Sequence, residues 1–406
     1  MNNIVFIGNS LAAVKAIEEI RKVNLTVGIT IVTDGVYPYD RERLFPYLSK
    51  EIKEKQTLLH PESFYKDNNV RVIGDQTIAR FNFKRNQVFF ENKEQLEYDV
   101  LVLADMATPR WPNIKGSHKE GVYNGVRLKD VKALAEQIPF VENVAVQLSS
   151  LAGLKMLCAL SNAGKEIVVA APSAALFTGL LDTESASILK QLLEQNGIRL
   201  MLDNPIEEIL GDAEAKAIRL KSGKVFAAEL IILDDLRLDI RIIKESGLEL
   251  PDSHSLQTNF KNVYLADAFL NAFRHPDSND YNTTSLMLAQ QGAVLAQAIL
   301  GQAVTVAPSL NVTRFQIKGL RGFWLGKTYL EEGGREFLKF DAHNNVYKKI
   351  FANETCLSGA VFFNAEEGEC SKILDVYEKQ LNIRGMEERL LEDDLDIAQL
   401  SKSQQP

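Results

Sequence analysis

Residues 4–13 read IVFIGNSLAA, and this stretch decides the fold. Ile4–Ile7 is an apolar run of strand length, and apolar residues then recur at helical spacing through Ala12–Val23. Val27–Val32 is a second apolar run of strand length. Strand, helix and strand, in this order and joined by a turn that contains a glycine, predict a βαβ unit at the amino end of the chain.

The same order of elements recurs later in the chain. Val144–Leu148 predicts a strand, Ala152–Ala163 a helix, Glu166–Ala170 a strand and Glu184–Asn196 a further helix. Two such units predict two Rossmann-like dinucleotide-binding domains rather than one large sheet.

Shorter apolar runs lie between and after the two units. Those between them predict a β-meander that ends in a buried strand; they are Val70–Ile73, Ile78–Phe83, Gln87–Phe90 and Val100–Leu103. Further strands are expected at Gly197–Leu202, Ala217–Leu220 and Leu230–Leu233. Asn262–Ala266 then predicts a strand and Thr284–Leu300 a long amphipathic helix. With these two elements we expect the chain to return to the first domain, so that the second domain is an insertion.

From Pro308 onward, aromatic and polar residues alternate, which predicts a separate small domain. Its expected strands are Arg314–Ile317, Phe337–Asp341, Tyr347–Phe351 and Leu357–Phe362, followed by a helix at Cys370–Gln380. The predicted fold is therefore α/β. Its first domain comprises residues 1–112 and 236–305, the second 113–235, the small C-terminal α/β domain 306–385, and an acidic, polar tail 386–406.

Composition excludes several classes of protein. The 406 residues are 46% hydrophobic with a net charge of −8, which excludes a disordered chain and argues against non-specific nucleic-acid binding. No apolar run reaches the roughly 18 residues of a membrane span, and the amino end lacks the pattern of a signal peptide. The 3 cysteines form no C-x-x-C pair and the 5 histidines have no metal-ligand spacing, so we expect no metal site. A cytoplasmic protein is expected.

Several motifs, in their order along the chain, resemble those of a known family. They are Gly8, the segment YPYDRERL at 37–44, the strand Leu101–Ala104, NVYLAD at 262–267, QQG at 290–292, and Tyr347-Lys-Lys and Leu357–Ala360 in the last domain. The chain resembles the FAD-dependent pyridine-nucleotide oxidoreductases, especially those of the NADH:rubredoxin oxidoreductase and nitrite reductase large-subunit type. The resemblance implies FAD in the first domain, NAD(P)H in the inserted domain, and hydride transfer from nicotinamide to flavin and on to an acceptor.

The resemblance also implies which residues bind FAD. Asp34 would accept ribose hydroxyls, Arg41 would lie near the flavin, and Gln291 and Gly292 would begin a helix whose dipole favours the flavin's pyrimidine carbonyls. Each position also has a structural alternative, such as a turn cap for Asp34, an ion pair for Arg41 or a helix cap for Asp267. The full set of cofactor-binding candidates is Gly8, Ser10, Ala13, Asp34, Arg41, Asp267, Gln291 and Gly292.

The first copy of the G-x-G-x-x-G/A fingerprint is altered at one position. Gly8 keeps the tight turn and Ala13 is a permitted packing residue. Ser10 occupies the position where the backbone of the family approaches the pyrophosphate, and its side chain would intrude there. We therefore expect a modified FAD site.

The second copy has lost more of the fingerprint. Leu148 and Ser150 stand where the first two glycines belong, only Gly153 remains, and Ala171 and Pro172 fall at the ribose-binding position. This pattern predicts that NAD(P)H is not bound.

Further family turns beside the cofactors have also lost their glycines. They read Ala104-Asp105-Met106, Leu233-Asp234-Asp235 and Ala266-Asp267. Asp105 and Asp235 would add carboxylates near the anionic phosphates, which is unfavourable in a partly buried site.

Three functional hypotheses remain open at this point. The first is an oxidoreductase-family flavoprotein, or a non-catalytic subunit derived from one, that acts in or alongside electron transfer with a protein partner or redox-protein acceptor. The second is an active FAD-dependent NAD(P)H:acceptor oxidoreductase with rubredoxin or a similar small redox protein as acceptor. The third is an interaction protein that uses the emptied second domain as a binding surface. An oligomer is compatible with all three.

Overall fold

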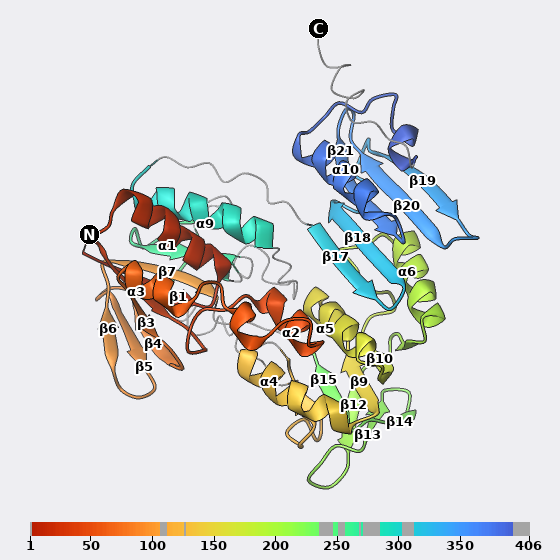
Figure 1. Ribbon diagram of the computed structural model, residues 1–406, viewed down its shortest axis with the longest axis horizontal. Coiled ribbons are helices and arrows are strands. Elements are labelled where there is room, and N and C mark those ends of the chain that lie inside the picture. The colour runs from red at the N-terminus through yellow and green to blue at the C-terminus, as the bar shows by residue number, and fades with distance from the viewer. Residues whose placement is uncertain are drawn as a thin grey trace. The chain divides into compact units, whose positions relative to one another are not determined.

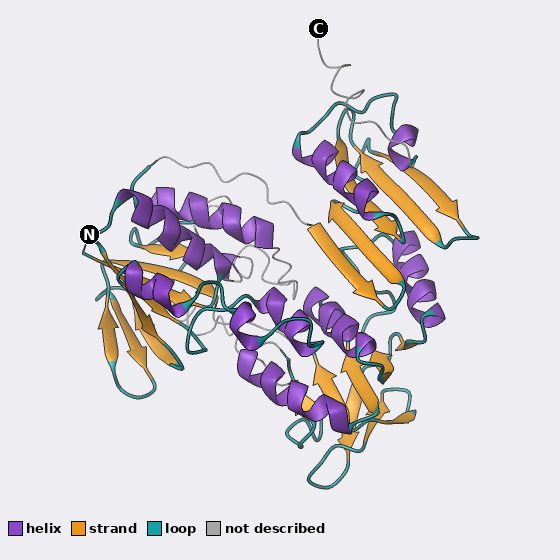
Figure 2. Ribbon diagram, viewed as in Figure 1, coloured by secondary structure: helices purple, strands orange, loops and turns teal. Residues whose placement is uncertain are grey.

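The computed structural model describes residues 2–105, 112–125, 127–234, 247–250, 256–267, 269–270, 285–302 and 312–392. The chain divides into two compact units, shown as ribbons in Figures 1 and 2. Unit 1 comprises Met1–Pro112, Tyr123–Pro139 and Asp235–Ser309, and unit 2 comprises Asn113–Val122, Phe140–Asp234 and Leu310–Pro406. Each unit contains a sheet with parallel strand pairs, so the predicted α/β fold of Rossmann type is confirmed.

The main sheet of unit 1 has the strand order β16-β7-β1-β2-β3, and its strands are parallel. Strand order reverses beside β1, so the carboxyl ends of β1 and β7 border the crevice in which Rossmann-type sheets bind ligands. The strand bounds are β1 Asn3–Gly8, β2 Gly28–Val32, β3 Val70–Ile73, β7 Val100–Asp105 and β16 Val263–Leu265.

The meander predicted for unit 1 is shorter in the structure at both ends. It begins later than Val70, because β3 pairs in parallel with β2 through Ile29 and Val70. Its expected last strand, Val100–Leu103, lies instead in β7, which pairs in parallel with β1. The antiparallel part of the meander is the three-stranded sheet of β4 Ile78–Asn82, β5 Gln87–Phe90 and β6 Gln95–Glu97. The helices of the unit are α1 Leu11–Val23, η1 Arg41–Arg43, α2 Leu44–Leu48, η2 Glu54–Thr57, α3 Glu62–Asp67, α4 Leu128–Gln137 and α9 Ser285–Ile299.

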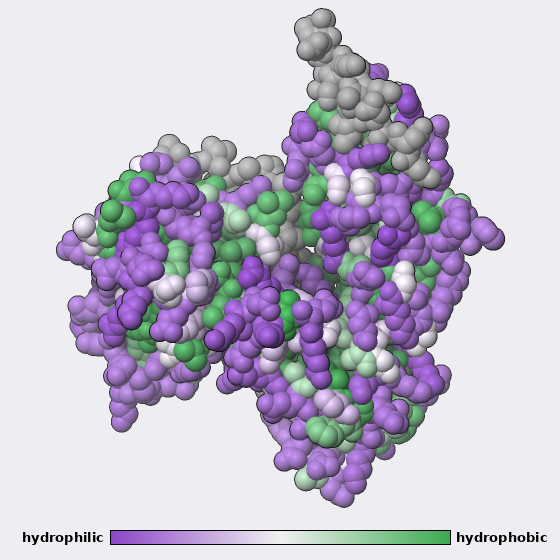
Figure 3. Space-filling model, in the orientation of Figure 1, coloured by the Kyte–Doolittle hydropathy of each residue, from purple (hydrophilic) through white to green (hydrophobic). Residues whose placement is uncertain are grey.

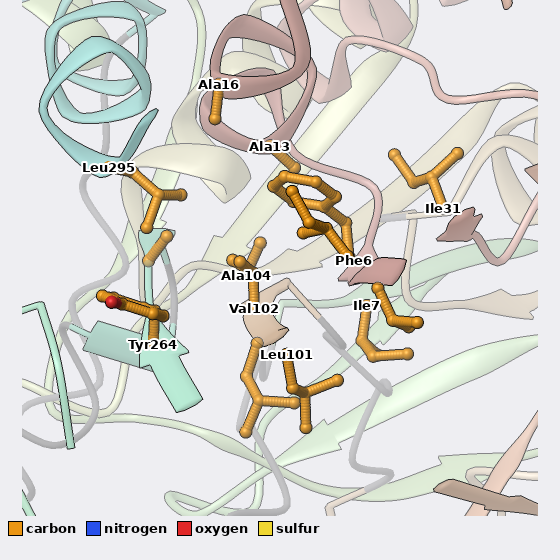
Figure 4. Packing of buried hydrophobic residues seen from close by; sticks show 14 of the residues in the cluster. Phe6, Ile7, Ala13, Ala16, Ile31, Leu101, Val102, Ala104, Tyr264 and Leu295 are labelled. Carbon is orange, nitrogen blue, oxygen red and sulfur yellow. The ribbon is translucent and has the colours of Figure 1, made fainter. Parts of the chain in front are cut away.

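Apolar side chains from the sheet, α1 and α9 form one core. Phe6, Val102 and Leu295 have no exposed surface, and Figure 4 shows them with neighbouring side chains of the cluster. Burial of these apolar side chains is the main source of stability for the sheet of unit 1.

The contact between α1 and α9, which lie side by side in Figure 1, depends on Gly292. A Cβ atom there would lie 2.5 Å from the carbonyl oxygen of Ala12 and 2.7 Å from the Cβ of Lys15. We therefore expect Gly292→Ala to separate the two helices. Faster hydrogen exchange of amides in α1 and α9 would report this separation.

A matched control for this prediction is Gly368, which lies in helix α10 (Glu367–Glu378) with open space around its Cβ position. Alanine there should leave exchange unchanged or slow it, because alanine favours helix by up to about 1 kcal/mol. Unchanged exchange of α1 in Gly292→Ala would contradict the packing role.

Unit 2 contains a sheet of order β11-β10-β9-β15-β8. Its bounds are β8 Val122–Tyr123, β9 Asn143–Gln147, β10 Glu166–Ala170, β11 Arg199–Met201 and β15 Leu230–Leu233. A three-stranded antiparallel sheet comprises β12 Ile206–Leu210, β13 Ala217–Leu220 and β14 Val225–Ala227. Helices α5 Leu151–Asn162 and α6 Thr183–Gln195 follow β9 and β10, and η3 Ile138–Phe140 precedes β9.

The C-terminal part of unit 2 is an antiparallel sheet of order β17-β18-β21-β20-β19 with helix α10 and η4 (Glu388–Leu391). Its bounds are β17 Val312–Ile317, β18 Leu320–Gly326, β19 Arg335–Asp341, β20 Val346–Ala352 and β21 Leu357–Phe363. The expectation of a solvated tail from residue 386 is wrong for its first residues, because Glu387, Leu390 and Leu391 are buried. Residues 393–406 of that tail lie outside the described residues.

Helix α4 belongs to unit 1, although the sequence predicted residues 113–235 as one inserted domain. The backbone N–H of Leu128 donates to the hydroxyl of Tyr39, and Lys132 pairs with Glu54 at 2.9 Å. These contacts attach the helix to the segment that follows β2.

Among the described residues, no helix is long and apolar enough to cross a membrane, and no cluster of His, Cys, Asp or Glu could hold a metal ion. Hydrophilic side chains cover most of the face seen in Figure 3, with apolar residues in small groups between them.

Candidate functional site

The turn between β1 and α1 lies at the crevice of unit 1. Gly8 has φ +114°, and a Cβ atom there would come within 1.7 Å of the carbonyl oxygen of Asp105, so only glycine fits. Ser10 caps α1, since its buried hydroxyl accepts a hydrogen bond of 3.1 Å from the N–H of Ala12. The serine thus satisfies one of the helix N–H groups that otherwise bind an anion. Ala13 is buried in the core, as a packing residue.

Asn9 is a candidate site residue that the sequence analysis did not name. It is 3% exposed, and its Oδ1 accepts from the N–H of Tyr39 at 2.7 Å and from the hydroxyl of Thr33 at 3.3 Å. Its buried Nδ2 has no hydrogen-bond partner among the described residues. A polar side chain directly after the turn glycine was the available signal.

Asp34 and Arg41 come together beside Asp105 at the carboxyl edge of the sheet. The Nε of Arg41 donates to Oδ2 of Asp105 at 2.6 Å, and its Nη2 lies 3.6 Å from Oδ2 of Asp34. Burial alone would lower the pKa of Arg41, but the combined attraction of Asp105, Tyr39 and Asp34 outweighs burial and raises this pKa above its ordinary value. The guanidinium is therefore charged and held by carboxylates of its own chain.

Tyr39 fixes the position of Asp34. Burial raises the pKa of the Tyr39 phenol, so the hydroxyl stays neutral and donates to Oδ2 of Asp34 at 3.3 Å. The other carboxylate oxygen of Asp34, Oδ1, is buried without a hydrogen-bond partner among the described residues. An unpartnered buried acceptor calls for a ligand or a water molecule.

Asp267 and Gln291 also lie together. Asp267 follows β16 with φ +49°, is 6% exposed, and donates its N–H to Oε1 of Gln291 at 2.6 Å. The expectation that Gln291 and Gly292 begin a helix is wrong, because the described part of α9 already starts at Ser285. Gln291 lies within α9, and its side chain accepts the N–H of Asp267. Gly292 lies where α9 packs closely against α1.

The corresponding turn of unit 2 is filled by the carboxylate of Asp234, which follows β15. Its Oδ2 accepts from the N–H groups of Ser149 and Ser150 at 3.2 and 2.8 Å, and its Oδ1 accepts from the hydroxyl of Ser150 at 2.8 Å. Asp234 is 2% exposed. Ser150 caps α5, so the carboxylate lies at the amino end of that helix, the place where Rossmann folds bind phosphate.

The packing glycine of this turn borders the same carboxylate, since a Cβ on Gly153 would lie 2.0 Å from Oδ2 of Asp234. Leu148, which stands at the first glycine position of the second fingerprint, is buried and 3% exposed. The sequence analysis named Asp235 as the added carboxylate, but Asp235 and Met106 lie outside the described residues and Asp234 makes these contacts.

Comparison with known proteins places the chain in a family. Residues 2–291 match the family described as pyridine nucleotide-disulphide oxidoreductase. The chain belongs to this family. The resemblance inferred from the motifs is thus confirmed, and it agrees with parallel sheets that carry two nucleotide-type turns.

Two curated relatives of the family come from Bacillus subtilis (strain 168). The chain is 26% identical over 405 residues to "Assimilatory nitrate reductase electron transfer subunit", covering 96% of this chain and 51% of that protein. It is 26% identical over 388 residues to "Nitrite reductase [NAD(P)H]", covering 94% and 48%. The chain therefore spans about half the length of these relatives.

A solved structure of the family supports the fold alone. The reductase in a covalent putidaredoxin reductase–putidaredoxin complex superposes with a TM-score of 0.82 at 15% identity, covering 99% of this chain and 98% of that chain. Members named among the relatives are NAD(P)H-dependent oxidoreductases and electron-transfer subunits.

Proposed function

We propose that this protein is a flavoprotein electron-transfer subunit that does not take electrons from NAD(P)H. It would act within a protein complex and exchange electrons with a protein partner. The proposal follows one relative's description as an electron transfer subunit and departs from the other's as an NAD(P)H enzyme.

The carboxylate of Asp234 is the observation that carries this proposal. A dinucleotide phosphate and the Asp234 carboxylate would compete for the same N–H groups of Ser149 and Ser150 at the start of α5. The two anions also repel each other, most strongly where water is excluded. Leu148 adds a side chain where the family has bare backbone, so pyrophosphate binding in unit 2 is disfavoured twice.

The first crevice is better suited to its cofactor. Oδ1 of Asp34 and Nδ2 of Asn9 are a buried acceptor and a buried donor without partners among the described residues. This pair suits the hydroxyl groups of the adenosine ribose of FAD, so Asp34 and Asn9 would hold that end, and Ser10 would border the phosphates. FAD, when bound, supplies the electron-accepting and electron-donating group, and the described residues bind and orient it.

The test is a comparison of two reductants under anaerobic conditions. We expect the purified protein, reconstituted with FAD, to show flavin absorbance bands that dithionite bleaches and that NADH or NADPH leaves unchanged. A related NAD(P)H-dependent reductase, bleached by NADH in the same cuvette conditions, is the positive control. When the protein is added to NADH, the fluorescence of NADH should likewise stay unchanged.

Two outcomes would contradict the proposal. Prompt bleaching by NADH or NADPH would establish the alternative, an active FAD-dependent NAD(P)H:acceptor oxidoreductase with rubredoxin or a similar acceptor. Failure of the protein to take up FAD would instead indicate a non-catalytic subunit with the fold of an oxidoreductase.

A further inference from the structure

Asp105 and Asp234 occupy matching places in the two nucleotide-type sheets. Asp105 is the last residue of β7, which pairs in parallel with β1, and Asp234 directly follows β15, which pairs in parallel with β9. In unit 2 the carboxylate binds the helix N-terminus, whereas in unit 1 it binds Arg41. Asp105 is 4% exposed and Arg41 25% exposed, so the carboxylate side of this ion pair is shielded from water.

We infer that Asp105 sets the affinity of the first crevice for FAD by holding the guanidinium of Arg41 away from the cofactor's phosphates. This inference rests on the proposed function, because it takes FAD as the ligand. Asp105 thereby determines the affinity for FAD, a role that the altered glycine motifs alone do not indicate.

The argument follows from charge and position. Arg41 lies at the carboxyl edge of the sheet, between Asp34 after β2 and Asp105 at the end of β7. Its guanidinium can pair with a phosphate, and guanidinium–phosphate pairs are strong when bidentate. To pair with a phosphate through its Nε, Arg41 would leave its 2.6 Å contact with Asp105. The freed carboxylate would then face the phosphates as a like charge.

The first test is Asp105→Asn, which keeps the size and an acceptor oxygen but removes the charge. We expect FAD to bind about tenfold to a hundredfold more tightly, the worth of one charge-assisted hydrogen bond. Equilibrium dialysis and flavin fluorescence quenching give the Kd. Asp105→Ser should change the Kd in the same direction, and circular dichroism verifies folding of both variants.

The matched control is Asp99→Asn. Asp99 is exposed and directly precedes the first residue of β7, and its carboxylate accepts from the N–H groups of Asn2 and Asn3. The Asp99→Asn substitution removes the same unit of charge, but the Kd for FAD should stay at the wild-type value.

A double-mutant cycle with Arg41→Ala identifies the group that benefits. We expect the gain from Asp105→Asn to disappear when Arg41 is alanine, because the released guanidinium is then missing. A gain of full size in the Arg41→Ala background would overturn the inference, as would wild-type affinity in both Asp105 variants. If the wild type binds FAD and Asp105→Asn does not improve it, only the inference fails. If no variant binds FAD, the proposed function fails with it.

Discussion

Replacing Asp234 with alanine is expected to lower the free energy of unfolding of unit 2 by about 2–4 kcal/mol, because three hydrogen bonds to a buried carboxylate are lost. Two backbone N–H groups at the start of α5 would then lack an acceptor. The chain has 2 tryptophans, Trp111 and Trp324, and Trp324 lies in β18 of this unit. Replacing Trp111 with phenylalanine leaves Trp324 as the fluorescent probe of urea unfolding of the unit.

Added phosphate gives the same variant a second readout. A helix amino end with free N–H groups binds anions, so inorganic phosphate should raise the unfolding midpoint of Asp234→Ala more than that of the wild type. Asp234→Asn, which keeps one acceptor oxygen, is the matched control and should lose less stability. Equal responses to phosphate in wild type and Asp234→Ala would show that the carboxylate does not occupy an anion site.

Lys349→Met is expected to destabilise unit 2 by about 3 kcal/mol, because removing one partner of a buried ion pair leaves its carboxylates uncompensated. The side chain of Lys349 in β20 is 2% exposed, and its ammonium lies 2.6 Å from Asp182, 2.8 Å from Glu184 and 3.2 Å from Glu336. The contacts with Asp182 and Glu184 join the C-terminal sheet to the start of α6. Urea unfolding followed by Trp324 fluorescence gives the change.

Lys339→Met in the neighbouring strand β19 is the matched control. Its partner is Glu392 at 2.7 Å, and both side chains are exposed by 40% or more, so the pair should contribute no more than about 1 kcal/mol. Equal losses in the two variants would contradict the special role of Lys349.

The pH dependence of the Lys349 contribution has a definite sign. Burial alone would lower the pKa of Lys349, but hydrogen bonds to Asp182 and Glu184 raise it above the ordinary value of 10.5. A folded-state pKa above the unfolded one gives stability that is complete below pH 10.5 and is lost as the pH rises through the folded value. Wild type and Lys349→Met should therefore differ equally at neutral and mildly alkaline pH and converge only beyond that.

The local elements of both βαβ units could be predicted from the sequence. In the second unit, β10 has the predicted bounds Glu166–Ala170. Outside the units, the apolar runs at Val70–Ile73 and Ala217–Leu220 match the bounds of β3 and β13. Strand β18 was missed, because its residues 320–326 are buried at most positions and include two glycines, so they do not alternate as an edge strand would. Periodicity reports which residues are buried and says nothing of which strand lies beside which.

Of the candidate site, the sequence identified the altered glycine positions, including Ser10 and Ser150. It left open whether Asp34 binds a ligand or caps a turn and whether Arg41 binds a ligand or forms an ion pair, and the structure places both beside Asp105. It also assigned the added carboxylate of unit 2 to Asp235, since neighbouring residues of one turn cannot be ranked without coordinates.

The sequence by itself determined the family and the two nucleotide-type folds, because a turn glycine, apolar periodicity and strand length are local properties of the chain. Only the tertiary structure decided what replaces the lost glycines. Asp234 reaches Ser150 across 84 positions and Asp105 reaches Arg41 across 64, and such pairings arise from strand order in the sheet. The partner of each carboxylate is the group that the fold places within hydrogen-bond distance, so it could be identified only from the tertiary structure.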